Sequence, residues 1–214
     1  MDVDNVTKIC QAAFYVIGST VAVLTYRKAK DTLLNTVNTE YQKKVLERVA
    51  LVSQELLEEF DPDSPRYWAR QEPIKEVLQQ LHDEVLPHKD EIIASGKKYP
   101  GIPIATEEER LRRWLETVRS DPFLPKPIRD AIVDLLDARI SVMSRVFIEE
   151  VERYSEALAK GKYWDTLDTN YHWLHNRIND KLYKQGVGVS QIQKEVHGLR
   201  DKIQEYYGQF DPRK

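Results

Sequence analysis

The sequence has little of what sheet proteins and disulfide-stapled domains need. It contains one cysteine, Cys10, which excludes an intramolecular disulfide framework and favours a reducing compartment. Its 214 residues include only eight glycines, and runs that alternate β-branched and polar residues are scarce, which argues against a sheet. The 32 basic and 35 acidic side chains give a net charge of −3. Such a balance provides no global attraction to nucleic acid, and we expect none to bind.

Proline is absent from residues 5–60, and Gly18 is the single glycine there. In the second half of this stretch apolar residues recur every three or four positions, as on one face of a helix. The pattern predicts one helix of about 55 residues, roughly 80 Å long at 1.5 Å per residue. The residues that form the stripe are Leu34, Val37, Tyr41, Val45, Val49, Val52, Leu56 and Phe60.

The segment Ile9–Tyr26 has 18 residues and no charge, and Arg27, Lys28 and Lys30 follow it directly. A membrane-spanning helix needs about 20 mainly apolar residues, with about 17–25 tolerated. The acidic start and the basic end place the C-terminal side in the cytoplasm by the positive-inside rule. We therefore expect a single-pass protein of the inner (cell) membrane with its N-terminus outside. A signal peptide fits poorly because its start should be basic, whereas a buried helix of a soluble protein stays an alternative.

Small and polar residues inside this segment follow one seam. Gln11, Tyr15, Gly18, Ala22 and Thr25 are spaced by four, three, four and three residues. In lipid such a seam usually faces another helix, because small residues allow close approach and polar groups need partners. The seam predicts a homo-oligomer in the bilayer, in which Gln11 and Thr25 line a narrow pore if enough copies surround one axis. The alternative is that these residues are ordinary members of a membrane helix and form no interface.

The predicted organisation is an all-α chain with an N-terminal transmembrane segment (1–30), an amphipathic stalk helix (31–60) and a cytoplasmic α-helical domain (61–214). We expect helices over 65–86, with a kink or restart at Pro73, over 106–120, from Pro127 to about Lys160, over 162–185 and over 190–207, and a short turn around 88–95. Capping boxes are expected at Thr106 with Glu109 and at Ser190 with Gln193.

Candidate chemistry in the helical domain is weak. Asp165, Asp168, His172 and His175 form a polar stripe, and the two histidines could share a metal ion only with a ligand from elsewhere. A polar flank beside the core explains the same pattern, so no metal, cofactor or catalytic residue is expected.

His82-Asp83 resembles the signature of the all-helical HD phosphohydrolases, but no upstream histidine completes it. The arginines of "ERLRRW" (109–114) are expected to form salt bridges along the helix.

The layout of "YVIGSTVAVLTYRKAK" after an acidic start resembles the small membrane proteins that accompany bacterial anti-phage systems. It is similar in plan, over residues 5–60, to the accessory membrane protein of type VI-B CRISPR systems. The Arg-x₄₋₆-His pattern of HEPN-type RNases, ascribed to that family, is missing from this sequence. The resemblance implies an oligomeric, pore-like assembly that perturbs the inner membrane when an intracellular sensor activates it.

Three functions are consistent with these features. The first is a non-enzymatic, oligomeric single-pass membrane protein with a cytoplasmic sensing or docking domain, acting as a pore-like effector. The second is a membrane-tethered scaffold or adaptor whose helical domain binds a protein partner. The third is a metal-dependent helical hydrolase that uses His172, His175 or the His82-Asp83 pair.

Overall fold

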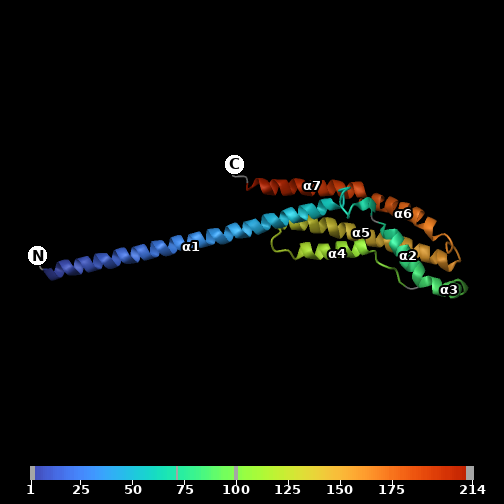
Figure 1. Cartoon of the computed structure of the whole chain (residues 1–214), viewed down its shortest axis with the longest axis horizontal. Coiled ribbons are helices and arrows are strands. Elements are labelled where there is room, and N and C mark those ends of the chain that lie inside the picture. The colour runs from blue at the N-terminus through green and yellow to red at the C-terminus, as the bar shows by residue number, and fades with distance from the viewer. Residues whose placement is uncertain (1–2, 71, 99–100, 211–214) are drawn as a thin grey trace. The chain divides into compact units, whose positions relative to one another are not determined.

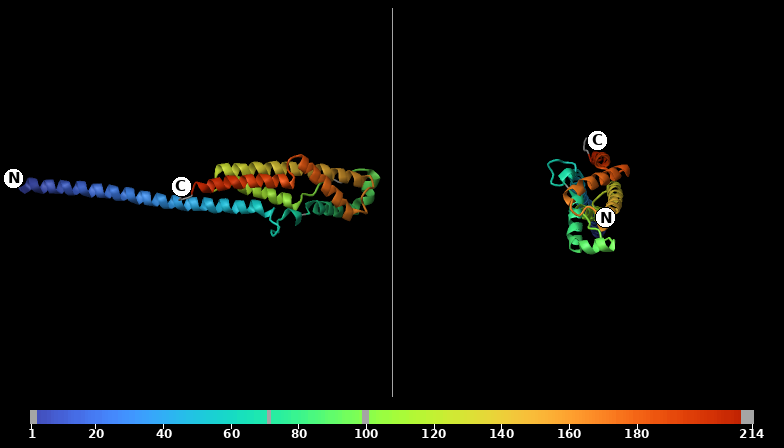
Figure 2. Two further views of the ribbon diagram at one scale, coloured as in Figure 1. Left: turned by 90° about the horizontal axis from the view of Figure 1, so that it is seen from above. Right: turned by 90° about the vertical axis from the view of Figure 1, so that its right-hand side faces the viewer.

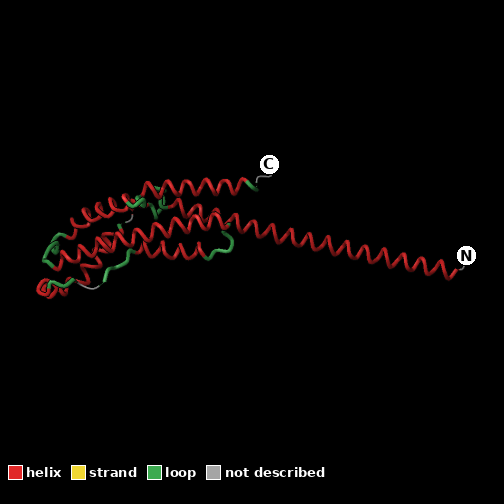
Figure 3. Tube along the Cα trace, turned by 180° about the vertical axis from the view of Figure 1, so that it is seen from behind, coloured by secondary structure: helices red, strands yellow, loops and turns green. Residues whose placement is uncertain are grey.

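The computed structural model describes the backbone of residues 3–70, 72–98 and 101–210, and all side chains in these ranges except those of residues 3–17 and Asp168. Every regular element in these ranges is helical (Figure 3), which confirms the predicted all-α class. The chain forms two compact units, residues 1–47 and residues 48–214. The first helix, α1 (Val3–Glu58), runs without interruption through residue 47. Its bounds confirm the single long helix that the absence of proline predicts.

The described part of the first unit, residues 3–47, is one helix, and a lone helix cannot bury its own apolar side chains. Every side chain from residue 18 to residue 44 is exposed. Val21, Val23 and Leu24 are 56%, 55% and 59% exposed, and the stripe residues Leu34 and Val37 are equally open. Within the residues that the structure describes, no helix is both long enough and apolar enough to cross a bilayer. Residues 9–17, half of the predicted span, lie outside the described side chains.

The unit formed by residues 48–214 is built from the end of α1 and the helices that follow (Figure 1). Helix α5 is its longest complete element, and α4, α6 and α7 pack along it (Figure 2). The bounds are η1 (Trp68–Arg70), α2 (Pro73–Val85), η2 (Leu86–His88), α3 (Lys89–Ser95), α4 (Thr106–Arg119), α5 (Lys126–Ala159), α6 (Leu167–Lys184) and α7 (Val189–Gly208).

The core of this unit lies on the broad apolar face of α5. That face meets apolar residues of α2 and α6 because each of these helices repeats its apolar positions with a helical period. Most side chains in the core are almost fully removed from water, and they include Val77, Leu78, Leu81, Val146, Val151, Tyr154, Leu174 and Ile178. On α4, Leu111, Leu115 and Val118 are buried, while Trp114 is half-buried and donates its indole N–H to Glu55 Oε2 at 2.6 Å.

Three predicted helix bounds are wrong, although the expected restart at Pro73 is confirmed. Residues 65–70 form no α-helix that continues into α2. The amide of Arg66 bonds to the Ser64 hydroxyl, and that of Trp68 bonds to the Glu59 carbonyl, so the segment folds back and Pro73 opens the helix. Residues 89–95 form a short helix rather than a turn. Helix α6 begins at Leu167 rather than residue 162, because Tyr163 adopts a φ of +70° that a right-handed helix excludes.

Both predicted capping boxes are also wrong, since the caps come from other residues. At α4, the backbone N–H and the hydroxyl of Thr106 both donate to Glu76 Oε1, at 3.2 and 2.5 Å, so a carboxylate of α2 caps the helix. At α7, Gln191 Oε1 accepts the backbone N–H of Gly188 at 2.9 Å. A carboxylate at an N-terminus satisfies open donors and complements the helix dipole.

Candidate functional site

An apolar cleft of about 680 Å³ lies in the unit formed by residues 48–214. We call it the α5–α7 cleft. Its walls come from α5, α6, the first turn of α7 and the segment 59–74 that links α1 to α2. The apolar residues that line it are Phe60, Trp68, Ile74, Met143, Phe147, Ile178, Leu182, Val187, Val189 and Ile192.

The turn between α6 and α7 forms one side of the cleft. Gly186 adopts a φ of +82° and ends α6, and the chain turns through Val187 into α7. Phe147 and Ile178 form the deep wall and are almost completely buried, whereas Trp68 stands at the edge and is 42% exposed. The α5–α7 cleft therefore has an apolar interior that opens to solvent.

Arg139 and Glu59 form the main polar contact in this cleft. Arg139 is buried, with 7% of its surface exposed. Both Nη groups of its guanidinium donate to the Glu59 carboxylate, one of them at 2.6 Å. The Nε–H of Arg139 is buried without an acceptor among the described residues. Two of the five N–H donors of this guanidinium therefore bond to Glu59, and its Nε–H lies beneath the protein surface.

The two histidines that the sequence pairs have different surroundings in the structure. His175 is half-buried and lines the α5–α7 cleft, where its Nε2 lies 2.7 Å from Asn179 Nδ2. His172 is exposed, and its ring lies against that of Tyr171 with the centroids 3.8 Å apart. Asp165 is exposed and close to Lys89, and the side chain of Asp168 lies outside the described residues. Across the described residues no three His, Cys, Asp or Glu side chains gather to hold a metal ion.

His82 lies in the core rather than in an open site. Its Nε2 is 2.9 Å from the Tyr154 hydroxyl, which also accepts a hydrogen bond from Asn170 Nδ2 at 3.1 Å. Burial lowers the pKa of His82, against an opposing effect of Asp83, and raises the pKa of Tyr154 to about 12. Asp83 is exposed and bonds to Gln79, so the two residues of the His82-Asp83 pair do not act on one site.

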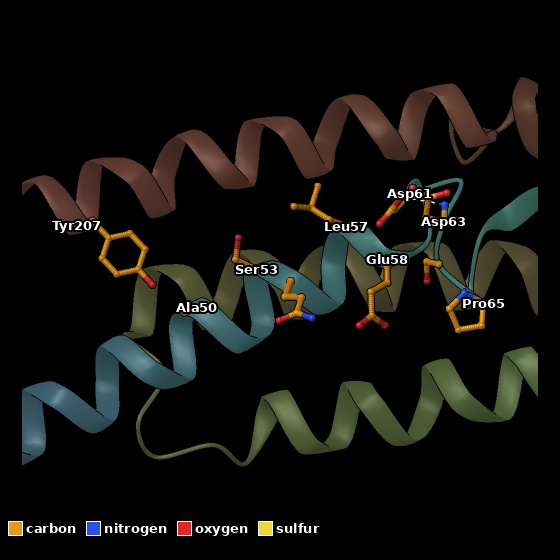
Figure 4. Close-up of a pocket in the computed structure, with 10 residues that line it drawn as sticks. Ala50, Ser53, Leu57, Glu58, Asp61, Asp63, Pro65 and Tyr207 are labelled. Carbon is orange, nitrogen blue, oxygen red and sulfur yellow. Dashed lines mark hydrogen bonds between the residues drawn. The ribbon is translucent and has the colours of Figure 1, made fainter.

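A second hollow, of about 630 Å³, lies at the C-terminal end of α1 (Figure 4). Tyr207 of α7 stands at one end of it, and Asp61, Asp63 and Pro65 stand at the other (Figure 4). Glu58 pairs with Arg66 at 2.7 Å, which neutralises part of its acidic character. The hollow is wide and shallow, and acidic residues at a helix end are ordinary solvated groups.

The membrane seam predicted from the sequence continues along α1 beyond the uncharged segment. Gly18, Ala22 and Thr25 are followed at the same spacing by Ala29, Thr32 and Thr36, all of them exposed. A groove of about 710 Å³ runs along this part of the helix, between Thr25 and Val37. The hydroxyls of Thr32 and Thr36 donate to the carbonyls of Lys28 and Thr32, at 2.8 and 3.0 Å. The hydroxyl donors of Thr32 and Thr36 on this small-residue face are therefore satisfied within α1.

The side chains of Gln11 and Tyr15, the first two residues of the predicted seam, lie outside the described residues. Arg27, Lys28 and Lys30 are exposed, like every other residue from 18 to 44. Two of the three arginines of 109–114 form the expected helical salt bridges, Arg110 with Glu107 at 2.5 Å and Arg112 with Glu108 at 2.6 Å.

No family model, no curated protein and no solved structure matches this chain. The resemblance to membrane proteins of anti-phage systems thus stays a prediction from the layout of residues 5–60.

Proposed function

We propose that this chain is a single-pass membrane protein that self-associates through the small-residue face of α1 and presents residues 48–214 as a docking domain. The observation that carries the proposal is the continuous face Gly18, Ala22, Thr25, Ala29, Thr32 and Thr36 on the part of α1, residues 18–44, where every side chain is exposed. Four- and three-residue spacing of this kind is the repeat of helices that pack in parallel around an axis.

The anchor is supported by how apolar residues are distributed around α1. Val21, Val23 and Leu24 point in different directions on a helix with about 100° per residue, yet each is more than half exposed. A helix that is apolar on all sides needs either a protein interior or lipid around it. Further along, Leu34, Val37 and Tyr41 keep to one side, as expected where the helix leaves the bilayer for water.

Self-association is supported by the composition of the face. Small residues allow two helix backbones to approach closely, which is the main source of attraction between helices in lipid. Gly18 has open space around it, since a Cβ added there meets no atom within 4 Å. A bulky residue at this face would therefore be accommodated in one chain and would act only against a neighbouring copy.

The anchor is tested by membrane fractionation and carbonate extraction of the full chain. The native protein is expected in the carbonate-resistant pellet. The pair Val16→Asp and Val21→Asp should move it to the soluble fraction, because each aspartate costs about 2.5–3.5 kcal/mol at the centre of a membrane helix. The matched pair Leu33→Asp and Val37→Asp, beyond the uncharged segment, should leave it in the pellet. A native protein that stays soluble would disprove the anchor.

A further inference from the structure

We propose that Arg27, Lys28 and Lys30, which we call the basic collar, bind the phosphate headgroups of anionic phospholipids. The collar directly follows the uncharged segment Ile9–Tyr26. The inference rests on the proposed function, because the collar meets headgroups only if that segment lies in a bilayer. It is based on the directions of the three side chains, on the ion pairs that they do not make and on the charge of the headgroup.

The basic collar and the small-residue face lie on opposite sides of α1. A helix turns by about 100° per residue, so Lys30, Arg27 and Lys28 follow one another around about 160° of its circumference. Ala29 and Thr32, which belong to the small-residue face, point to the other side. Two copies that pack through the small-residue face therefore turn their collars away from each other and toward the lipid around them.

The cations of the collar have no ion-pair partner among the described residues, although an acid is within reach. Asp31 lies three residues after Lys28 and four after Arg27, the spacings at which side chains of one helix meet. At the same spacings on α4, Arg110 and Arg112 do pair with glutamates. The collar is therefore available to an anion from outside the chain.

The chemistry of the collar fits an anionic phospholipid. Arginine and lysine donate charge-assisted hydrogen bonds to phosphate oxygens. Each cation close to an anionic leaflet strengthens binding about fivefold. Asp31 is the single acid between residues 18 and 39, so basic side chains outnumber it three to one there. Tyr26, directly before the collar, has the amphipathic ring that favours the headgroup level of a bilayer. A headgroup with a net negative charge therefore gains more from the collar than the zwitterionic headgroup of phosphatidylcholine.

The test is native mass spectrometry of the full-length protein in a non-ionic detergent, which counts the lipids that each chain retains. The probes are dioctanoyl phosphatidylglycerol, dioctanoyl phosphatidylcholine and glycerol 3-phosphate, which carries the phosphate without acyl chains. The collar variant combines Arg27→Gln, Lys28→Gln and Lys30→Gln. Glutamine keeps the helix propensity of lysine and arginine, and circular dichroism checks that the helix content is unchanged. The control variant removes three exposed cations elsewhere, by Lys43→Gln, Lys194→Gln and Lys202→Gln.

We expect the native protein and the control variant to bind phosphatidylglycerol at least tenfold more tightly than phosphatidylcholine. The collar variant should bind the two lipids within about twofold of each other, because it has lost the charges that distinguish their headgroups. Equal binding of both lipids by the native protein, or an equal loss in the two variants, would overturn the collar as the site. If glycerol 3-phosphate bound as tightly as phosphatidylglycerol, the ligand would be a soluble phosphate and the lipid site would be overturned.

The anchor itself is decided by a separate measurement, the carbonate extraction. A native protein that resists extraction but binds both lipids equally would overturn the collar alone. A native protein that carbonate extracts would disprove the anchor, and the collar would then have no bilayer to meet.

Discussion

The imidazole of His82 and the hydroxyl of Tyr154 lie 2.9 Å apart in the core, although 72 residues separate them in the chain. Asn170 donates to the Tyr154 oxygen, which leaves the Tyr154 O–H free to donate to His82 Nε2. This assignment requires a neutral imidazole. A polar group buried in this way is stable only while each of its hydrogen bonds is made.

We predict that the protein loses stability as the pH falls below the ordinary pKa of histidine, about 6.5. The pKa of His82 is lowered in the folded state by burial, so the unfolded chain takes up the proton first. Stability is therefore full above that value and declines towards the folded-state pKa, by about 1.4 kcal/mol for each unit between the two. Thermal unfolding between pH 7.5 and pH 5 measures the decline.

The control for this prediction is another histidine of the same unit. His82→Gln should flatten the pH dependence in this range, at some cost in stability at neutral pH. His197→Gln changes an exposed residue of α7 and should leave the slope unchanged. If His82→Gln kept the native slope, the titrating group would be a different residue.

Glu150 joins α5 to α6, and we predict that Glu150→Gln is strongly destabilising. Its carboxylate is completely buried and meets Lys181 at 2.6 Å, Arg177 at 2.8 Å and Arg153 at 3.0 Å. The amide would remove the charge that these cations share, and we expect a loss of about 2–4 kcal/mol, because a buried pair is costly to break. Chemical denaturation of both forms measures the difference.

Glu149 is the matched control, since it neighbours Glu150 and also contacts Lys181, at 2.9 Å, but on the surface. Glu149→Gln should change the unfolding midpoint far less, because exposed ion pairs contribute little. A similar loss in both variants would mean that burial of the carboxylate does not matter.

The small-residue face predicts a specific crosslink between copies. In a Cys10→Ser background, one cysteine per chain can form disulfides only between chains. Ala29→Cys should yield covalent dimers under mild oxidation, because equivalent residues on a close parallel interface approach the Cα separation of about 4.4–6.8 Å that a disulfide needs. Asn38→Cys, on the opposite side of the helix, should stay monomeric on a non-reducing gel. Equal crosslinking at both positions would disprove this interface.

The pore is a separate prediction and depends on Gln11. If several copies surround a wet axis, liposomes that contain the native protein should leak ions, and Gln11→Leu should reduce the flux at least several-fold, because it removes a polar group from the lumen. Val23→Leu, on another side of the helix, is the control. Unchanged flux in Gln11→Leu would exclude Gln11 from the lumen, and a monomer in detergent would exclude the pore.

The sequence by itself predicts most of the helices, because their information is local. Apolar residues at helical spacing define α1, α4, α5 and α7, and the proline-free stretch 5–60 predicts one continuous helix, as observed. The same local spacing identifies the seam at Gly18, Ala22 and Thr25. The cations that follow the uncharged segment are evident from the order of the residues. Each of these features depends on residues only a few positions apart, and the period of a helix is enough to show that such residues share a face.

The tertiary structure decided what depends on distant residues. Glu76 replaces the expected capping box of α4 because α2 brings a carboxylate to Thr106 across 30 positions of sequence. Of the two histidines of α6, only His175 lines the cleft, because α5 and α7 pack near that residue and leave His172 exposed. His82, which resembles a catalytic motif in the sequence, is instead fixed in the core by Tyr154. Spacing along one helix predicts which residues share a face, but what meets that face depends on packing between helices.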